Sequence, residues 1–278
     1  MTRALFAVTR GKDQVAAEAE GSGIDPMHQF LVEPLFGRHF SLAGYDISFT
    51  NSALFMVITA AILWLFMLGG MKRELVPGRW QAAVEGMTSF VSNMMTTNIG
   101  PEGKKFTPYV FSLFMFILFA NLIGLFPLGI VPGWHPFTVT SHITLTAVLA
   151  FFSFGIVLVV GFLRHGLHFF ALFVPHGTPK VMIPLIFVIE LASFLVRPFS
   201  LGLRLFVAMT AGHILLDVFA SFVVQGFNAS GPLGWVVAIL SFVMIVGISA
   251  LELLVSAIQA YVFALLTSLY LNDAVNLH

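Results

Sequence analysis

Charged residues are scarce in this chain of 278 residues. Asp, Glu, Lys and Arg together make up 9% of it, whereas a soluble globular domain carries about 25%. Because 58% of the residues are hydrophobic, this deficit predicts an integral membrane protein. Cysteine is absent, which excludes disulfides, thiolate metal sites and cysteine nucleophiles. Thirteen basic residues balance thirteen acidic ones, so we expect no surface for binding nucleic acid.

The N-terminus lacks the apolar core of a cleaved signal peptide. The only apolar run there is the tetrapeptide that begins at Leu5, and a signal-peptide core needs at least ~7 apolar residues. We interpret residues 1–25 as a mobile polar tail.

Three stretches are apolar enough to cross a bilayer upright. They lie at 52–70, 109–126 and 143–163, and roughly 20 apolar residues cross a ~30 Å hydrocarbon core. Residues 80–99 differ, because apolar side chains recur there at helical spacing and polar ones occupy the rest of the wheel. We predict an amphipathic helix in the membrane interface. Its apolar stripe consists of Trp80, Val84, Met87, Val91 and Met94.

The last hundred residues predict a long helix hairpin at 181–226 and 232–271, with a turn at 228–232. Each helix would be ~60 Å long, about twice the thickness of the hydrocarbon core. Both helices must therefore tilt steeply, bend or extend beyond the membrane, and Pro198 offers one bend. The predicted fold is a single all-α membrane domain over 1–278, with three upright spans, one interfacial helix and this tilted hairpin.

The short loops predict the orientation. Lys and Arg residues follow the first span, precede the second and follow the third, whereas the loops at 127–141 and 227–234 contain none. Basic loops stay in the cytoplasm. We therefore predict an N-terminus outside and a C-terminus in the cytoplasm.

One face of the first hairpin helix carries charges that are costly in a bilayer. A charged side chain at the bilayer centre costs about 2.5–3.5 kcal/mol on insertion scales. Glu190, Arg197 and Arg204 lie seven residues apart, a spacing that drifts only about 20° per step around an α-helix. Ser193 and Ser200 flank the same face.

A second set of titratable residues lies on the opposite face. His213 is nine residues beyond Arg204, close to 180° around the helix, and Asp217 is one turn further on the same side. If the hairpin turns near residue 230, His213 lies at the register of Glu252, and Arg204 at that of Gln259. On the second helix, one polar stripe has the spacing 3, 4, 3: Ser249, Glu252, Ser256 and Gln259.

Arg204 cannot itself carry a proton, because a guanidinium stays protonated at any physiological pH. It can instead hold a nearby carboxylate in its ionised form. The nearest acid on its stripe, Glu190, is roughly 21 Å away along the helix axis. The implied counter-charge is a carboxylate of another subunit.

These residues carry a resemblance to a known family. The run Arg197–Phe206, followed by Gly212-His213, resembles the signature of the ATP synthase subunit a family. The second hairpin helix also matches, with Glu252 and then Ile258–Phe263, and the predicted second span looks like that of the family. The resemblance covers about residues 27–271. Ala208 departs from it, since the family usually has Asn at this position.

The resemblance implies a stator subunit of the bacterial F-type ATP synthase, with two half-channels beside a rotating ring of c subunits. A proton enters from outside, binds a ring carboxylate, travels round with the ring and leaves to the cytoplasm. Arg204 would separate the two paths and force the arriving carboxyl group to release its proton. The implied path residues are Glu190 and Ser193 towards the cytoplasm, and His213, Asp217, Glu252, Gln259, Asn121, Ser141 and His142 elsewhere along the path.

The resemblance also implies partners and a location. The partners are the c-ring, the b subunits of the peripheral stalk, the rest of the synthase complex and the lipid bilayer. The location is the bacterial inner membrane. The subunit would not be an enzyme by itself and would need no cofactor.

Other interpretations remain open from the residues alone. Glu252 and His213 could form a static ion pair, Asn121 could only join helices, and His142 could only cap a helix. A secondary ion transporter would also use intramembrane charges, but the repeated halves typical of that class are absent. A haem protein would need facing histidine pairs on its spans. The sequence does not decide between H⁺ and Na⁺.

Overall fold

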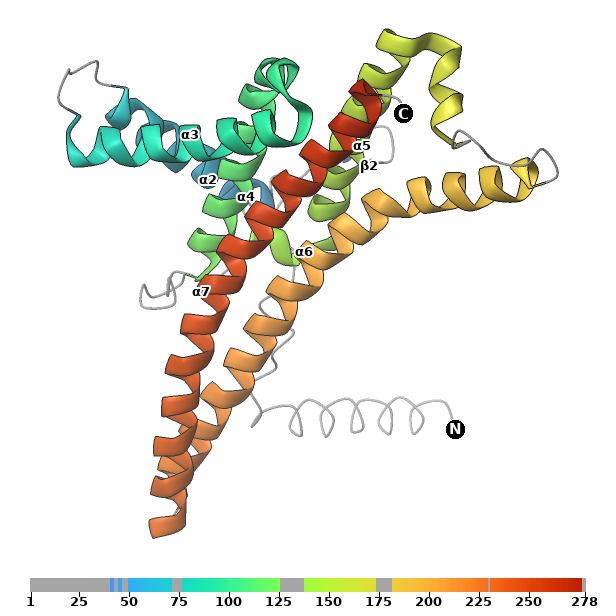
Figure 1. Cartoon of the computed structure of the whole chain (residues 1–278). Coiled ribbons are helices and arrows are strands. Elements are labelled where there is room, and N and C mark those ends of the chain that lie inside the picture. The colour runs from blue at the N-terminus through green and yellow to red at the C-terminus, as the bar shows by residue number, and fades with distance from the viewer. Residues whose placement is uncertain are drawn as a thin grey trace, which may run out of the picture. The chain divides into compact units, whose positions relative to one another are not determined.

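The computed structural model describes residues 41–42, 45–46, 50–71, 77–125, 138–173, 182–229 and 231–276. The predicted tail at 1–25 lies outside these residues. The prediction of an all-α membrane protein is confirmed: five of the described helices, α2, α4, α5, α6 and α7, are long and apolar enough to cross a membrane. The elements are β1 (Ser41–Leu42), β2 (Tyr45–Asp46), α2 (Asn51–Gly70), α3 (Arg79–Ile99), η3 (Pro101–Lys105), α4 (Thr107–Leu125), η5 (Val139–Ser141), α5 (Ile143–His165), η6 (Gly166–Phe173), α6 (Ile183–Asn228) and α7 (Pro232–Val275) (Figure 1). The strands form one short antiparallel pair.

Helices α2 and α3 pack closely because glycine ends the first of them. The hydroxyl of Thr50 caps the start of α2 by accepting a hydrogen bond from the backbone N–H of Ala53. At its other end, a Cβ on Gly70 would lie 2.4 Å from a methyl carbon of Val84. Only a residue without a side chain allows this approach.

Helix α3 buries one face and exposes the other, as an amphipathic helix does. Its buried residues are Gln81, Val84, Val91, Met95 and Ile99. The buried face is rotated slightly from the predicted stripe, because Trp80 is 54% exposed. The indole of Trp80 instead donates a 2.9 Å hydrogen bond to the carbonyl of Phe66 on α2.

Helix α4 lies at the centre of the packing. Half of it is buried, whereas the other four candidate spans each bury less than a quarter of their residues. It packs against α2, α3 and η5, and its Tyr109 hydroxyl lies 2.9 Å from that of Ser153 on α5. Helix α3 also reaches α7, where Asn98 donates a 2.6 Å hydrogen bond to Ser268. This bundle supports the helices that carry the charged residues.

Polar contacts join the C-terminal end of α5 to η3 and α7. Arg164 forms an ion pair with Glu102 of η3. The hydrogen bond from Arg164, together with its positive charge, holds the pKa of the Glu102 carboxyl group below its ordinary value. The neighbouring His165 ring donates to the carbonyl oxygen of Val275 at 3.2 Å, at the end of α7.

The hairpin helices α6 and α7 are continuous over 46 and 44 residues, and Pro198 lies inside α6 without interrupting it. At 1.5 Å per residue each exceeds ~60 Å, and Figure 1 shows both as long unbroken coils. Contacts divide the described chain into two compact units: a smaller one within His213–Ser249, and a larger one within Phe30–Gly212 and Ala250–His278. The tilt of the hairpin in a membrane stays a prediction.

Within the smaller unit, the two helices approach closely at glycine. A Cβ on Gly226 would lie 2.7 Å from the carbonyl oxygen of Gly234 and 2.9 Å from the Cβ of Ala238. The rings of Phe227 and Trp235 pack edge to face, with centroids 5.1 Å apart. The chain therefore reverses between these pairs, where the sequence predicts the turn.

Candidate functional site

Arg204 lies on a face of α6 that packing leaves open. Two residues earlier, Gly202 is buried against α5, where an added Cβ would lie 3.1 Å from the carbonyl oxygen of Thr146 and 3.3 Å from the Cβ of Ala150. Positions two residues apart point to nearly opposite sides of a helix. The packing of Gly202 on α5 thus turns Arg204 outward.

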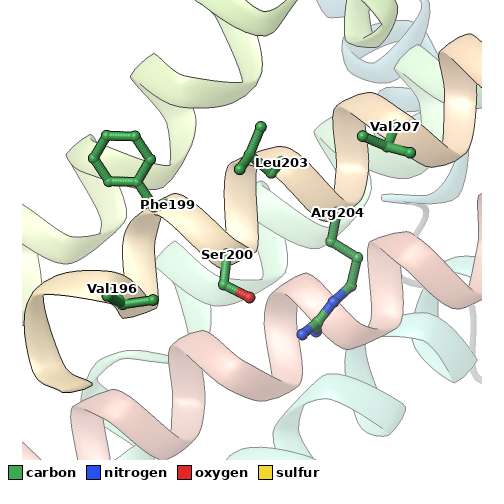
Figure 2. A pocket seen from close by; sticks show the side chains of 6 residues that line it. All are labelled: Val196, Phe199, Ser200, Leu203, Arg204 and Val207. Atoms are coloured by element: carbon green, nitrogen blue, oxygen red, sulfur yellow. The ribbon is translucent and has the colours of Figure 1, made fainter.

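The exposed Arg204 lines an open groove of about 450 Å³ on the surface of α6. Figure 2 shows the guanidinium of Arg204 and the hydroxyl of Ser200 pointing to the same side of the helix. The other four lining side chains are apolar: Val196, Phe199, Leu203 and Val207. A permanent cation therefore stands in an apolar surface that is itself exposed.

No acidic side chain in the described part of the chain forms an ion pair with Arg204. A permanent charge among apolar groups is expensive unless a counter-charge or water compensates it. The guanidinium of Arg204 is thus available to a negatively charged group of a neighbouring molecule that covers the groove.

Arg197, two turns earlier, is compensated within the chain. Its guanidinium lies 2.8 Å from an Asp273 carboxylate oxygen and 3.9 Å from one of Glu190. The guanidinium carbon lies 5.3 Å from the ring centre of Phe194 and 5.1 Å from that of Tyr270, within the range of cation–π attraction. The two arginines of the predicted stripe therefore differ: Arg197 has an acidic partner, and Arg204 has none among the residues that the structure describes.

A buried polar cluster joins α4, η5 and α7 behind this face. Thr140 donates a 2.7 Å hydrogen bond to the Asn121 side-chain oxygen. The Asn121 amide in turn donates to the backbone carbonyl of Ser256 at 3.3 Å. Asn121, Thr140 and Ser256 are each fully buried. The structure thus brings the predicted Asn121 against the predicted polar stripe of α7.

The same cluster reaches α6. The Ser256 hydroxyl contacts the sulfur of Met209 at 3.7 Å, and the Thr210 hydroxyl donates to the carbonyl of Ser141 at 3.3 Å. The ring of His142 lies 3.5 Å from the Ser141 hydroxyl, and its backbone stands at the N-cap of α5. His142 thus takes the position of a helix cap and also borders this cluster.

Glu252 is buried, with 2% of it exposed, and its carboxylate lies against the backbone of α6. A Cβ on Gly212 would lie 2.5 Å from a carboxylate oxygen of Glu252. The glycine therefore leaves the space that the carboxylate occupies.

The remaining predicted residues are distributed along the hairpin. Ser193 is exposed on the stripe of Arg204, and Gln259 is half-buried on α7. His213 is buried and Asp217 half-buried, and both lie in the smaller unit, one helical turn apart on α6. The pairing of His213 with Glu252 would join the two units and stays a prediction.

Four residues of these clusters were missed by the sequence analysis: Thr140, Met209, Thr210 and Asp273. Threonine and methionine are common in membrane proteins, so the first three carry no distinguishing signal. Asp273 does carry one, since it is the last acidic residue of the chain and follows a long apolar run.

This arrangement can transfer protons and stabilise charge. It combines a buried carboxylate, buried hydroxyl and amide groups, and a cation that cannot be deprotonated. Within the described residues, no three His, Asp or Glu side chains are placed so that they could hold a metal ion.

Comparison with known proteins gives one consistent result. Residues 53–272 match the family described as ATP synthase A chain. The chain is 72% identical to "ATP synthase subunit a" of Rhizorhabdus wittichii, over 94% of this chain and 99% of the relative. It is 70% identical to the protein of the same name from Sphingopyxis alaskensis, with the same coverage. The protein of that name from Zymomonas mobilis is 63% identical, over 94% of this chain and all of the relative.

Proposed function

Because the chain belongs to the ATP synthase A chain family, we propose that it supplies two proton half-channels beside a ring of c subunits, with Arg204 at the point where they are separated. As a member of this family it is a proton-translocating, multi-pass membrane subunit of the F-type ATP synthase and works with the rest of that complex. In this proposal the subunit has no catalytic site of its own. Its role is to pass protons between the half-channels and the carboxyl groups of the ring.

The observation that carries the proposal is the contrast between the two arginines. Arg197 has an acidic partner within hydrogen-bond distance, whereas Arg204 has none among the described residues and lines an open apolar groove. A ring helix that placed its carboxylate in this groove would supply the missing counter-charge. Its apolar side chains would cover Phe199, Leu203 and Val207.

The proton steps follow from the chemistry of these groups. A ring carboxyl group that approaches Arg204 loses its proton, because the fixed positive charge stabilises the carboxylate and not the neutral acid. The proton passes to the cytoplasmic path. The carboxylate then moves past Arg204 and takes a new proton from the outer path. Since the guanidinium keeps its protons, it blocks direct flow between the two paths.

The buried cluster is the proposed outer path. Glu252 and His213 can both take up and release a proton. Asn121 and Ser141, together with His142, lie nearer its outer end, and Asp217 continues the path on the face of His213. The hydrogen bond from Asn121 to Ser256 supports this, because it brings the second-span residue against the stripe of Glu252 and Gln259.

Glu190 and Ser193 form the proposed cytoplasmic path. Both lie on the stripe of Arg204 towards the N-terminal end of α6, and both are at least partly exposed. Partial exposure lets water reach a carboxylate that receives protons from the ring. The c-ring and the b subunits of the peripheral stalk are the proposed neighbours in the inner membrane.

A cysteine cross-link tests whether the groove faces the ring. The chain contains no cysteine, so a single Val207→Cys is a unique reporter, and it pairs with a cysteine placed next to the ring carboxylate. Mild oxidation should join the two subunits, because a disulfide forms only when the two Cβ atoms come within about 4.5 Å. The matched control is Leu65→Cys, which is also more than half exposed but lies on α2.

A cross-link from Val207→Cys without one from Leu65→Cys supports the proposal. A secondary ion transporter, which works without a ring, predicts no product from either variant. Equal yields from both positions would show that the groove has no special place against the ring.

A further inference from the structure

Asp273 lies beside the proposed cytoplasmic path but belongs to neither predicted stripe. It stands in the last turn of α7, and 33% of its side chain is exposed. Its carboxylate accepts a 2.8 Å hydrogen bond from the Nη1 atom of Arg197 on α6. The partner of Asp273 is thus the arginine that also neighbours Glu190.

The two acids share this arginine unequally. The Nη2 atom of Arg197 lies 3.9 Å from the Glu190 carboxylate, beyond the 2.7–3.2 Å range of N–H···O hydrogen bonds. The rings of Phe194 and Tyr270 lie next to the guanidinium. Arg197 is therefore bound by Asp273 and only near to Glu190.

A small movement of the Arg197 guanidinium would exchange its acceptor, from Asp273 to Glu190. Glu190 is two helical turns before Arg197. Because a long side chain on a helix points back towards the N-terminus, the Arg197 side chain leans towards Glu190. A shift of about 1 Å would bring the guanidinium within hydrogen-bond distance of Glu190. The acceptor that opposes this shift is Asp273.

We propose that Asp273 is a positioning residue for proton exit: it holds Arg197 away from Glu190, so that the Glu190 carboxylate remains available to accept and release protons. The inference rests on the proposed role of Glu190 in the cytoplasmic path. During ATP-driven pumping, a proton from cytoplasmic water binds the Glu190 carboxylate and then passes to a ring carboxylate, which restores the charge of Glu190. An Arg197 hydrogen bond to that carboxylate opposes its protonation and slows the cycle.

Removal of Asp273 should therefore free Arg197 to bind Glu190. Asp273→Ala should lower ATP-driven proton uptake by inverted vesicles about tenfold, since a hydrogen bond to a charged group changes an equilibrium by about that factor. Asp273→Glu keeps an acceptor and should retain uptake. The matched control is Asn272→Ala, which removes a hydrogen bond that the Asn272 side chain accepts from Asn276 on the surface of α7.

The decisive variant combines Arg197→Gln with Asp273→Ala. This variant removes both Arg197, which would bind Glu190, and Asp273, which holds Arg197 in place. Proton uptake should therefore return close to the level of the parent. Arg197→Gln alone should also pump. Intact mass of the purified complex checks assembly in each case. A purely structural ion pair predicts instead that Asp273→Ala, which leaves the partly buried Arg197 charge without its partner, lowers the yield of assembled complex. The proposal predicts an assembled complex that pumps slowly.

Three results separate the possible failures. Uptake by Asp273→Ala that equals the parent overturns the inference, and so does a double variant no better than Asp273→Ala. Glu190→Gln is the test of the underlying path and should lose uptake. If Glu190→Gln pumps like the parent, the proposed cytoplasmic path is wrong, and the inference falls with it.

Discussion

Arg197 and Arg204 show how two identical side chains, two turns apart on one helix, acquire different tasks. Arg197 lies between two aromatic rings and donates to Asp273, so its charge is used within the subunit. Arg204 faces an open apolar groove, so its charge is available to a neighbour. The difference comes from the surroundings, since both guanidinium groups stay protonated.

Glu252 is the buried carboxylate of the proposed outer path, and Gly212 leaves the space for its carboxylate. The hairpin register predicts that Glu252 acts together with His213, which follows Gly212 on α6. In such a predicted pair, removing either residue leaves the other buried with fewer partners, which costs ~1–3 kcal/mol. Exchanging them keeps one imidazole and one carboxylate at the site.

We therefore expect His213→Glu with Glu252→His to pump protons better than either single variant. The measurement is proton uptake by inverted vesicles on addition of ATP, with assembly checked by intact mass. If all three variants assemble and pump like the parent, the two residues carry no protons, and a static role remains for them.

The sequence predicts single residues unevenly, and the reason is their chemistry. Glu190, Arg204 and Glu252 are recognisable because a charge in an apolar helix needs an explanation. The contact of Asn121 with the α7 stripe could not be read from spacing, because it depends on how α4 packs against α7. Thr140 and Thr210 could not be singled out, because threonine is common in membrane proteins and carries no charge.

At the scale of the helices, hydrophobic runs located the elements well. The observed helices α2 to α7 lie within a few residues of the predicted ranges, since long apolar stretches leave little choice of secondary structure in a membrane. The ends were less predictable: α7 continues to Val275, beyond the predicted end at 271. In that last turn, the Asp273 carboxylate accepts a hydrogen bond from Arg197 of α6, and the backbone carbonyl of Val275 accepts one from His165 of α5.

Helix α3 shows which part of a helical pattern tertiary packing decides. The period of its apolar residues predicts an amphipathic helix, and one face is indeed buried. Which face is buried depends on the partner, and Gln81 is buried where Trp80 was expected. The Trp80 indole satisfies its N–H on α2 instead.

For the whole molecule, the positive-inside rule predicts the side on which each loop lies. Single cysteines at Ser230 and Asn276, in a chain that otherwise has none, should react with a membrane-impermeant reagent from opposite sides of sealed vesicles. The first should react from outside and the second from the cytoplasmic side. Reaction of both from one side would reject the predicted orientation.

The central claim is that Arg204 forces the ring carboxylate to release its proton. Its direct measurement is ATP synthesis driven by an imposed proton gradient in vesicles that contain the assembled complex. Arg204→Ala should lower the rate by about a hundredfold or more, the scale of loss when a preorganised charge is removed from a transfer site. Arg204→Lys should also fail badly, because a compact ammonium lacks the planar fork of the guanidinium.

Val207→Ala, in the same groove, is the control and should support synthesis, because it changes the lining without changing the charge. The account predicts loss of synthesis in both Arg204 variants, with complexes of normal mass. Synthesis at the parental rate by either assembled Arg204 variant would contradict it.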